Sequence, residues 1–159
     1  MSALAVAERE SATAAQFVTF RIGGQLFGTP ILGVHEVFEL ERVARVPLAP
    51  PEIDGVLNLR GRIVTTIAMR SLLGFPPRAA TAERSLAIGV EFKGEFYGLV
   101  IDEVGEVMAL DGARSEPVPA NLDRRWAETV AGVFRLDGEL MLIIDIERAL
   151  GRVSAQNGL

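Results

Sequence analysis

Short runs in which apolar and polar residues alternate fill much of this chain, and a period of two is typical of β-strands that bury one face. The run 17–22 precedes a tight turn and a second short run at 25–28, and the runs 86–92 and 95–98 repeat this arrangement. Four two-residue turns of hairpin type separate such runs: Gly23-Gly24, Arg60-Gly61, Lys93-Gly94 and Asp137-Gly138. The pattern therefore predicts a mainly β protein built from short hairpins.

The chain also contains an internal repeat. Residues 55–74 recur without a gap as 132–151, with glycines at both ends and in the turn of each copy. An upstream block, 27–37, matches 97–107 with the same internal spacing. Because only two copies are present, a pair of small domains is favoured over a solenoid. We expect one unit at about 16–75, a linker at 76–84, and a second unit at about 85–152.

Each predicted unit has four or five short strands rich in valine and isoleucine. Closing such a sheet into a small barrel removes its exposed edges, so two small barrels are expected. A unit of this size buries too little surface to be stable alone, and the two barrels should therefore pack together.

Short helices complete the predicted layout. They are expected at 70–73 and 146–150, where Gly74 and Gly151 occupy the position that ends many helices. A short surface helix is expected within 121–129. It carries the only tryptophan, which we interpret either as a partly buried staple or as an anchor for a partner.

Composition narrows the classes of partner. The net charge is −5, and the acidic excess lies after residue 85, which argues against nucleic acid and against anionic membrane surfaces. No stretch approaches the roughly 20 apolar residues of a membrane helix, so direct membrane insertion is not expected. The absence of cysteine excludes disulfides and makes the cytoplasm the simplest location. The ends, 1–15 and 153–159, are predicted to be flexible tails.

Catalytic chemistry has little support in the sequence. His35 is the only histidine, and we interpret it as a surface residue. Acidic residues at 102–106 and 145–147 suggest carboxylate pairs, but neighbouring residues on a strand point to opposite faces, which favours solvated acids. No glycine cluster has the order of a phosphate-binding loop. We therefore predict no enzymatic activity, no cofactor and no metal site.

The two copies differ most in the charge of one hairpin turn. Arg60 and Arg62 in the first copy correspond to Asp137 and Glu139 in the second. One interpretation is an ion pair within the protein between Arg60 and Glu36. The other is that a partner meets this polar edge beside apolar residues of the Glu36 segment. The two interpretations are compatible, and both stay open.

Residues 55–64, centred on Asn58-Leu59-Arg60-Gly61, resemble the signature stretch of the CheW family. The resemblance covers residues 16–152. Further matching positions are 17–20, Phe27-Gly28, Val34-x-Glu36-Val37, Met69-Arg70, Leu73-Gly74, 97–102 and 141–146.

This resemblance implies a bacterial chemotaxis coupling protein made of two SH3-like five-stranded β-barrels with short helices. Such proteins have no enzymatic activity. They bridge the histidine kinase CheA, whose regulatory domain shares the fold, to the cytoplasmic tips of methyl-accepting chemoreceptors. The resemblance therefore implies a cytoplasmic adaptor that is recruited to membrane-associated receptor arrays.

The resemblance also implies a set of partner-binding positions. The receptor tip, a helical hairpin, is expected in the groove between the barrels. Gly98 is expected to permit a close approach by the partner. The positions are Val34, Glu36, Asn58, Arg60, Arg62, Gly98, Val100 and Ile101.

One position departs from the family pattern. Many members carry an aspartate where this chain has Ala68, and the second copy keeps an acid there, Asp145. Without that carboxylate, Arg70 is expected to be freer or paired elsewhere. Alternatives to chemotaxis coupling are an adaptor of a related pathway governing pili or development, a kinase modulator that inhibits, and a small ligand-binding or enzymatic barrel.

Overall fold

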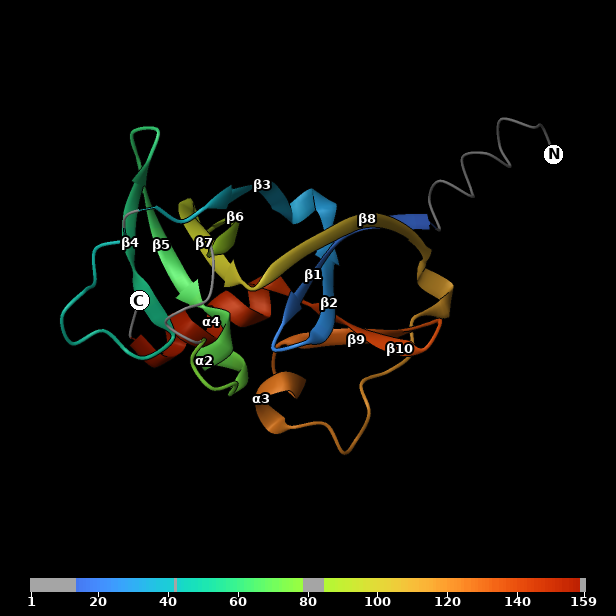
Figure 1. The fold of residues 1–159 in the computed structure, drawn as a ribbon. Helices are drawn as coiled ribbons and strands as arrows, with labels where there is room; N and C mark the ends of the chain where they lie inside the picture. Colours follow the sequence, from blue (N-terminus) through green and yellow to red (C-terminus); the bar gives the residue numbers. More distant parts are fainter. Residues whose placement is uncertain (1–13, 42, 79–84, 158–159) are drawn as a thin grey trace.

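The computed structural model describes residues 14–41, 43–78 and 85–157, and these form two five-stranded sheets with short helices (Figure 1). Sheet A has the strand order β8-β1-β2-β10-β9, and sheet B has the order β3-β6-β7-β5-β4. The strands are β1 (Ala14–Ile22), β2 (Gln25–Pro30), β3 (Val34–Glu39), β4 (Ile53–Leu59), β5 (Arg62–Ala68), β6 (Leu86–Phe92), β7 (Glu95–Ile101), β8 (Glu103–Asp111), β9 (Val130–Leu136) and β10 (Glu139–Ile144).

Each sheet is built from both copies of the repeat. The hairpin β1–β2 joins β8, β9 and β10, whereas the hairpin β6–β7 joins β3, β4 and β5. In sheet A the hairpin pairs antiparallel with β8 and parallel with β10, and in sheet B it pairs antiparallel with β3 and parallel with β5. The expected units 16–75 and 85–152 therefore do not correspond to the two sheets. Hairpin signals report pairing between neighbouring strands, and the exchanged pairs are distant in sequence.

The two ends of each sheet are drawn together by a single bridge. In sheet B, Ala44, which follows β3, pairs with Val56 on β4. In sheet A, Glu116, which follows β8, pairs with Val133, the repeat counterpart of Val56. The mainly β fold with two five-stranded sheets is confirmed, and full closure of each sheet into a barrel stays a prediction.

A glycine precedes each bridging valine, in close contact with the segment across the bridge. A Cβ atom on Gly55 would lie 2.5 Å from the carbonyl oxygen of Ala44. A Cβ atom on Gly132 would lie 2.7 Å from the side-chain oxygen of Ser115. Gly55 thus permits the close backbone contact of the bridge in sheet B, whereas Gly132 makes room for the Ser115 side chain in sheet A.

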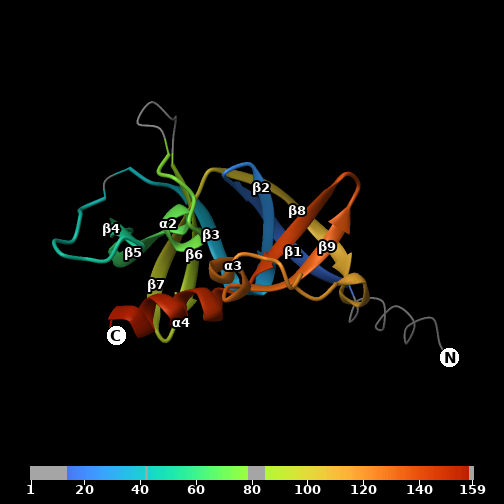
Figure 2. The ribbon, with the colours of Figure 1, turned by 90° about the horizontal axis from the view of Figure 1, so that it is seen from below.

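One continuous core joins the two sheets. The helices α2 (Met69–Leu73) and α4 (Ile146–Asn157) lie where the sheets meet, and α3 (Arg124–Ala127) lies beside them (Figures 1 and 2). The shared core therefore lies between the two sheets, and not between the two expected units. Its fully buried large side chains include Ile22, Phe27, Ile67, Met69, Leu72, Ile88, Leu99, Ile144 and Leu150.

The last helix differs from the expectation. Gly74 adopts φ +78° and ends α2 as predicted, but α4 continues through Gly151 to Asn157. A Cβ at Gly151 would meet nothing within 4 Å, so the position is an ordinary helical one. Val153, only 3% exposed, extends the apolar face of α4 into the core. The predicted tail at 153–159 is therefore largely helix, and residues 158–159 lie outside the described residues.

The short helix expected within 121–129 is α3, and its tryptophan is a staple. The indole nitrogen of Trp126 donates to the carbonyl oxygen of Leu73 at 2.6 Å, and its ring contacts Phe27 and Phe75. At the other end of the chain, β1 begins at Ala14, within the predicted tail 1–15. The rest of that tail, 1–13, and most of the linker, 79–84, lie outside the described residues.

The exchanged hairpins predict that neither half of the chain folds alone. Separating the chain between residues 78 and 85 leaves each fragment without at least two strands of every sheet. We expect fragments 1–78 and 85–159 to lack cooperative unfolding separately and to regain it when mixed, because the shared core re-forms. Circular dichroism with urea titration checks this. A single fragment that unfolds cooperatively as a monomer would contradict it.

Candidate functional site

The hairpin β4–β5 carries Arg60 at its tip, where it pairs with Glu36 on β3. Arg60 and Gly61 have φ of +51° and +85°, and the side-chain oxygen of Asn58 accepts from the amide of Gly61 at 2.9 Å. This turn directs Arg60 across the gap between β3 and β4, the two edge strands of sheet B. The interpretation of an internal ion pair is confirmed.

The Glu36–Arg60 pair contributes little to the free energy of folding. The Arg60 side chain is 69% exposed and that of Glu36 is 33% exposed. Exposed pairs of this kind contribute about 0–1 kcal/mol to folding. The pair therefore orders the hairpin tip without contributing much stability, and its charges stay within reach of a partner.

The other charged residues of the repeated turns have different surroundings. The guanidinium of Arg62 lies 4.3 Å from the centre of the Phe96 ring, a cation–π contact. Its repeat counterpart Glu139 pairs with Arg21 at 2.8 Å, and the hydrogen bond from Arg21 lowers the pKa of Glu139. The acidic turn of sheet A is thus partly neutralised within the protein, whereas Arg62 rests on an aromatic ring.

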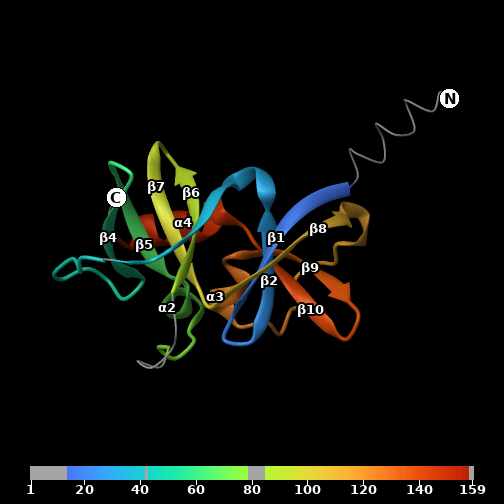
Figure 3. The same cartoon turned by 45° about the horizontal axis from the view of Figure 1, so that its top comes forward.

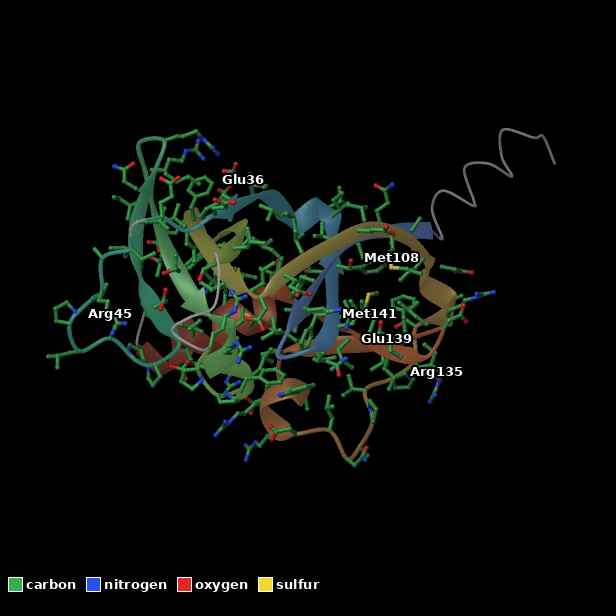
Figure 4. The ribbon with its side chains drawn as sticks, in the orientation of Figure 1. Glu36, Arg45, Met108, Arg135, Glu139 and Met141 are labelled. Carbon is green, nitrogen blue, oxygen red and sulfur yellow. The ribbon has the colours of Figure 1, made fainter. Side chains whose placement is uncertain are left out.

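Exposed valines accompany the Glu36–Arg60 pair. The edge strands β3 and β8 run along the same side of the molecule, and Glu36 lies on that side (Figures 1, 3 and 4). Val37 on β3, and Val104 and Val107 on β8, are 37%, 43% and 52% exposed. We call this face, with the Glu36–Arg60 pair, the β3–β8 surface. Exposed apolar residues beside charges are typical of protein interaction sites.

The sequence did not identify the two valines of β8 as site residues. The repeat aligns Val104 with Val34 and Val107 with Val37, so their equivalence to residues of the first copy was visible. It gave no sign that they would be exposed, because exposure depends on β8 being an edge strand of the other sheet.

Two predicted site residues lie inside the fold. Gly98 is buried opposite Gly89, and a Cβ atom on Gly98 would lie 3.1 Å from the ring of Phe38. Ile101 is 1% exposed and belongs to the core. Neither residue offers a side chain to a partner. Gly98 instead leaves room for Phe38, as Gly28 leaves room for Met141 inside sheet A (Figure 4).

The remaining apolar candidates lie apart from the hairpin tip. Val34 is half-buried and packs against the core. Val100 is half-buried in a separate groove between the loop 45–54 and the start of α2. The structure therefore brings together four of the eight predicted residues: Glu36, Asn58, Arg60 and Arg62.

Position 68 is an alanine and offers no carboxylate, and Arg70 pairs with the carboxylate of Asp102. Two guanidinium nitrogens of Arg70 donate to Asp102 at 3.0 and 2.6 Å, and the amide of Gly23 donates to the same carboxylate at 2.8 Å. Burial raises the pKa of Asp102, but these hydrogen bonds outweigh burial and the pKa is lowered overall. Asp102 is the single residue between β7 and β8, so this network fixes the crossing from sheet B to sheet A.

The part of the chain that the structure describes holds neither a candidate metal cluster nor a candidate membrane-spanning helix. There, no group of three or more histidine, aspartate or glutamate side chains is placed to hold a metal ion. No helix in the same residues is long and apolar enough to cross a membrane.

Comparisons with known proteins agree with this fold. A family model described as "CheW-like domain" matches residues 16–154. "Chemotaxis protein CheW" of Klebsiella aerogenes is 31% identical over 136 residues, which cover 85% of this chain and 81% of that protein. The protein of the same name from Treponema pallidum is 29% identical over 142 residues, with coverage of 84% and 80%.

A solved structure is similar over nearly the same span. The crystal structure of the scaffolding protein TtCheW from Thermoanaerobacter tengcongensis superposes with a TM-score of 0.76 at 30% sequence identity. The match covers 86% of this chain and 92% of that one. The similarity therefore extends over both sheets.

The close approach of Gly98 to Phe38 gives a test of whether Gly98 is needed for packing inside the fold. Gly98→Val is expected to destabilise the protein by about 2 kcal/mol, because the new side chain overpacks against Phe38. Combining it with Phe38→Ala should cost at least about 1 kcal/mol less than the sum of the two single changes. Urea unfolding measures this, with Gly151→Val as the unhindered control. Additive costs would show that the two residues do not compete for space.

The lowered pKa of Asp102 generates a pH prediction. Its ionised form stabilises the fold fully above the unfolded pKa of about 3.9, and this contribution is lost as the pH falls through the lower folded value. Asp102→Asn should cost about 2 kcal/mol at pH 7 and much less at pH 2. Unfolding free energies at both pH values check this, with exposed Asp137→Asn as the control. An equal cost at both pH values would refute the assignment.

Proposed function

This chain belongs to the CheW family, and we propose that it uses the β3–β8 surface to hold a chemoreceptor while its sheets pair with the kinase CheA. The family match over residues 16–154 is the observation that carries the function. Members are non-enzymatic scaffolds that couple chemoreceptors to CheA in chemotaxis, and this chain is such a scaffold. The protein therefore acts by binding other proteins, and its specificity depends on the surfaces that bind them.

The proposed receptor site is supported by shape and chemistry. The edge strands β3 and β8 belong to different sheets, so the surface spans the junction where a helical hairpin can lie. Val37, Val104 and Val107 supply apolar area for the helices. The exposed charges of Glu36 and Arg60 border this area, and charges at a rim set register and encounter rate more than affinity.

The proposed kinase contact rests on the shared fold of the kinase's regulatory domain. A domain of the same two-sheet architecture can pair with this one sheet to sheet, at a face distinct from the β3–β8 surface. Both contacts place the protein in the cytoplasm beside membrane-associated receptors. An adaptor of a related pathway would use the same surfaces with different receptors, and the receptor fragment that binds identifies the pathway.

Reversing the charge of Arg60 tests the receptor site. Arg60→Glu is expected to weaken binding of a receptor-tip fragment about tenfold, because it places two like charges at the rim. Its melting temperature should change little, because the lost pair is exposed. Pulldown and titration with the receptor fragment measure the first effect, and thermal melting measures the second.

A double variant with the two charges exchanged separates the role of Arg60 in the pair within the protein from a direct contact of Arg60 with the receptor. Glu36→Arg with Arg60→Glu restores the pair within the protein. If Arg60 meets the receptor directly, the double variant stays weak; recovery would show that the pair acts only by ordering the hairpin. Arg135→Glu is the matched control, because Arg135 pairs with Glu116 at 2.7 Å in the corresponding part of sheet A. Undiminished receptor binding by Arg60→Glu would exclude this surface.

A further inference from the structure

A cavity of about 380 Å³ opens at one end of sheet B, beside the Glu36–Arg60 pair. Its volume lies within the range of small-molecule sites. The proposed receptor site uses two residues of its rim, Glu36 and Arg60, and leaves the cavity itself without a role. The residues that line it are His35, Glu36, Phe38, Leu59, Arg60, Arg62, Val64, Gly89, Phe96 and Tyr97.

Aromatic rings form much of the cavity wall. Gly89 and Gly98 face each other across β6 and β7, and the ring of Phe38 lies against both positions. Phe96 and Tyr97 add two further rings on β7, and burial raises the pKa of the Tyr97 hydroxyl, which therefore stays neutral. The glycine pair makes room for the ring of Phe38, which forms part of the wall. A wall of aromatic rings suits a flat apolar group.

Arg62 is the charge at the rim that can receive an anion, while the carboxylates of Glu91 and Glu95 lie beside two lining residues, 3.5 Å from His35 and 3.2 Å from the Tyr97 hydroxyl. Arg60 and Arg62 both line the cavity, and Glu36 is the one carboxylate among the lining residues. Glu36 is already paired with Arg60. Among the residues that the structure describes, no carboxylate pairs with Arg62, whose guanidinium rests on Phe96. A guanidinium in this position can bind a carboxylate through two parallel hydrogen bonds.

We propose that this cavity binds a small molecule with an aromatic body and a single carboxylate. Arg62 holds the carboxylate at the rim, and the rings of Phe38, Phe96 and Tyr97 contact the body. Binding itself does not depend on the scaffold function. Because Arg60 belongs to both the rim and the β3–β8 surface, an effect of the ligand on receptor affinity does rest on that proposed function.

The probe 3-phenylpropionate tests the site on the full-length chain. Titration into ¹⁵N-labelled protein should give saturable amide shifts confined to residues 35–38, 59–64, 89 and 96–97. A dissociation constant of about 1 mM is expected for a ligand of this size. The uncharged isostere 3-phenylpropanamide should bind about tenfold more weakly, because it lacks the charge that Arg62 recognises. Acetate, which has the charge and no ring, should give no confined shifts.

Two variants and a control connect binding to the named residues. Arg62→Gln should weaken 3-phenylpropionate about tenfold and leave the neutral amide unchanged. Phe96→Leu should weaken both compounds, because it removes part of the wall. Arg135→Gln, an exposed arginine on sheet A, should bind as the unmodified chain does. Melting temperatures confirm that each variant is folded.

Three results would overturn the proposal. These are shifts that do not saturate, shifts spread over the whole surface, and equal affinity in the Arg62→Gln variant. Receptor and CheA binding are measured separately on the same preparations without ligand. A failed titration beside intact receptor binding therefore rejects the cavity alone, and failed receptor binding beside a saturable titration rejects only the docking proposal.

Discussion

The structure depends on pairing along both strands of each exchanged hairpin: β1 with β8 and β2 with β10 in sheet A, and β6 with β3 and β7 with β5 in sheet B. These contacts place the first hairpin of each repeat in the sheet formed by the other. Once they form, each sheet needs both halves of the chain, and the helices α2 and α4 fill the junction with a common core. A duplicated sequence of two marginal units becomes one cooperative body, which explains how short strands build a stable scaffold.

The residues that are identical in the two copies mark positions where the fold has no room for a side chain or where the backbone turns sharply. Gly55 permits the bridge in sheet B, Gly132 makes room for Ser115 beside the bridge in sheet A, and Gly28 and Gly98 leave room for one large side chain in each sheet. The residues that differ between the two turns lie at the surface. The arginines of one turn and the acids of the other are free to diverge because neither set packs in the core.

Features set by neighbours in sequence could be predicted, and features set by distant contacts could not. The hairpin turns and the end of α2 at Gly74 follow from local sequence, and the Glu36–Arg60 pair is suggested by opposite charge on the two segments. The exchange of hairpins, the burial of Gly98 and the extension of α4 depend on elements far away in the chain. For the candidate site, sequence located the charged tip but not the exposure of Val104 and Val107.

The crossing at Asp102 has a mechanical consequence. The chain passes from sheet B to sheet A with one residue between β7 and β8, and Asp102 is clamped there by Arg70 from α2 and by the amide of Gly23 from the opposite hairpin. No slack segment separates the sheets at this point to absorb a displacement. A displacement of one sheet at this crossing therefore acts directly on the other sheet, through the single residue that joins them and its hydrogen bonds.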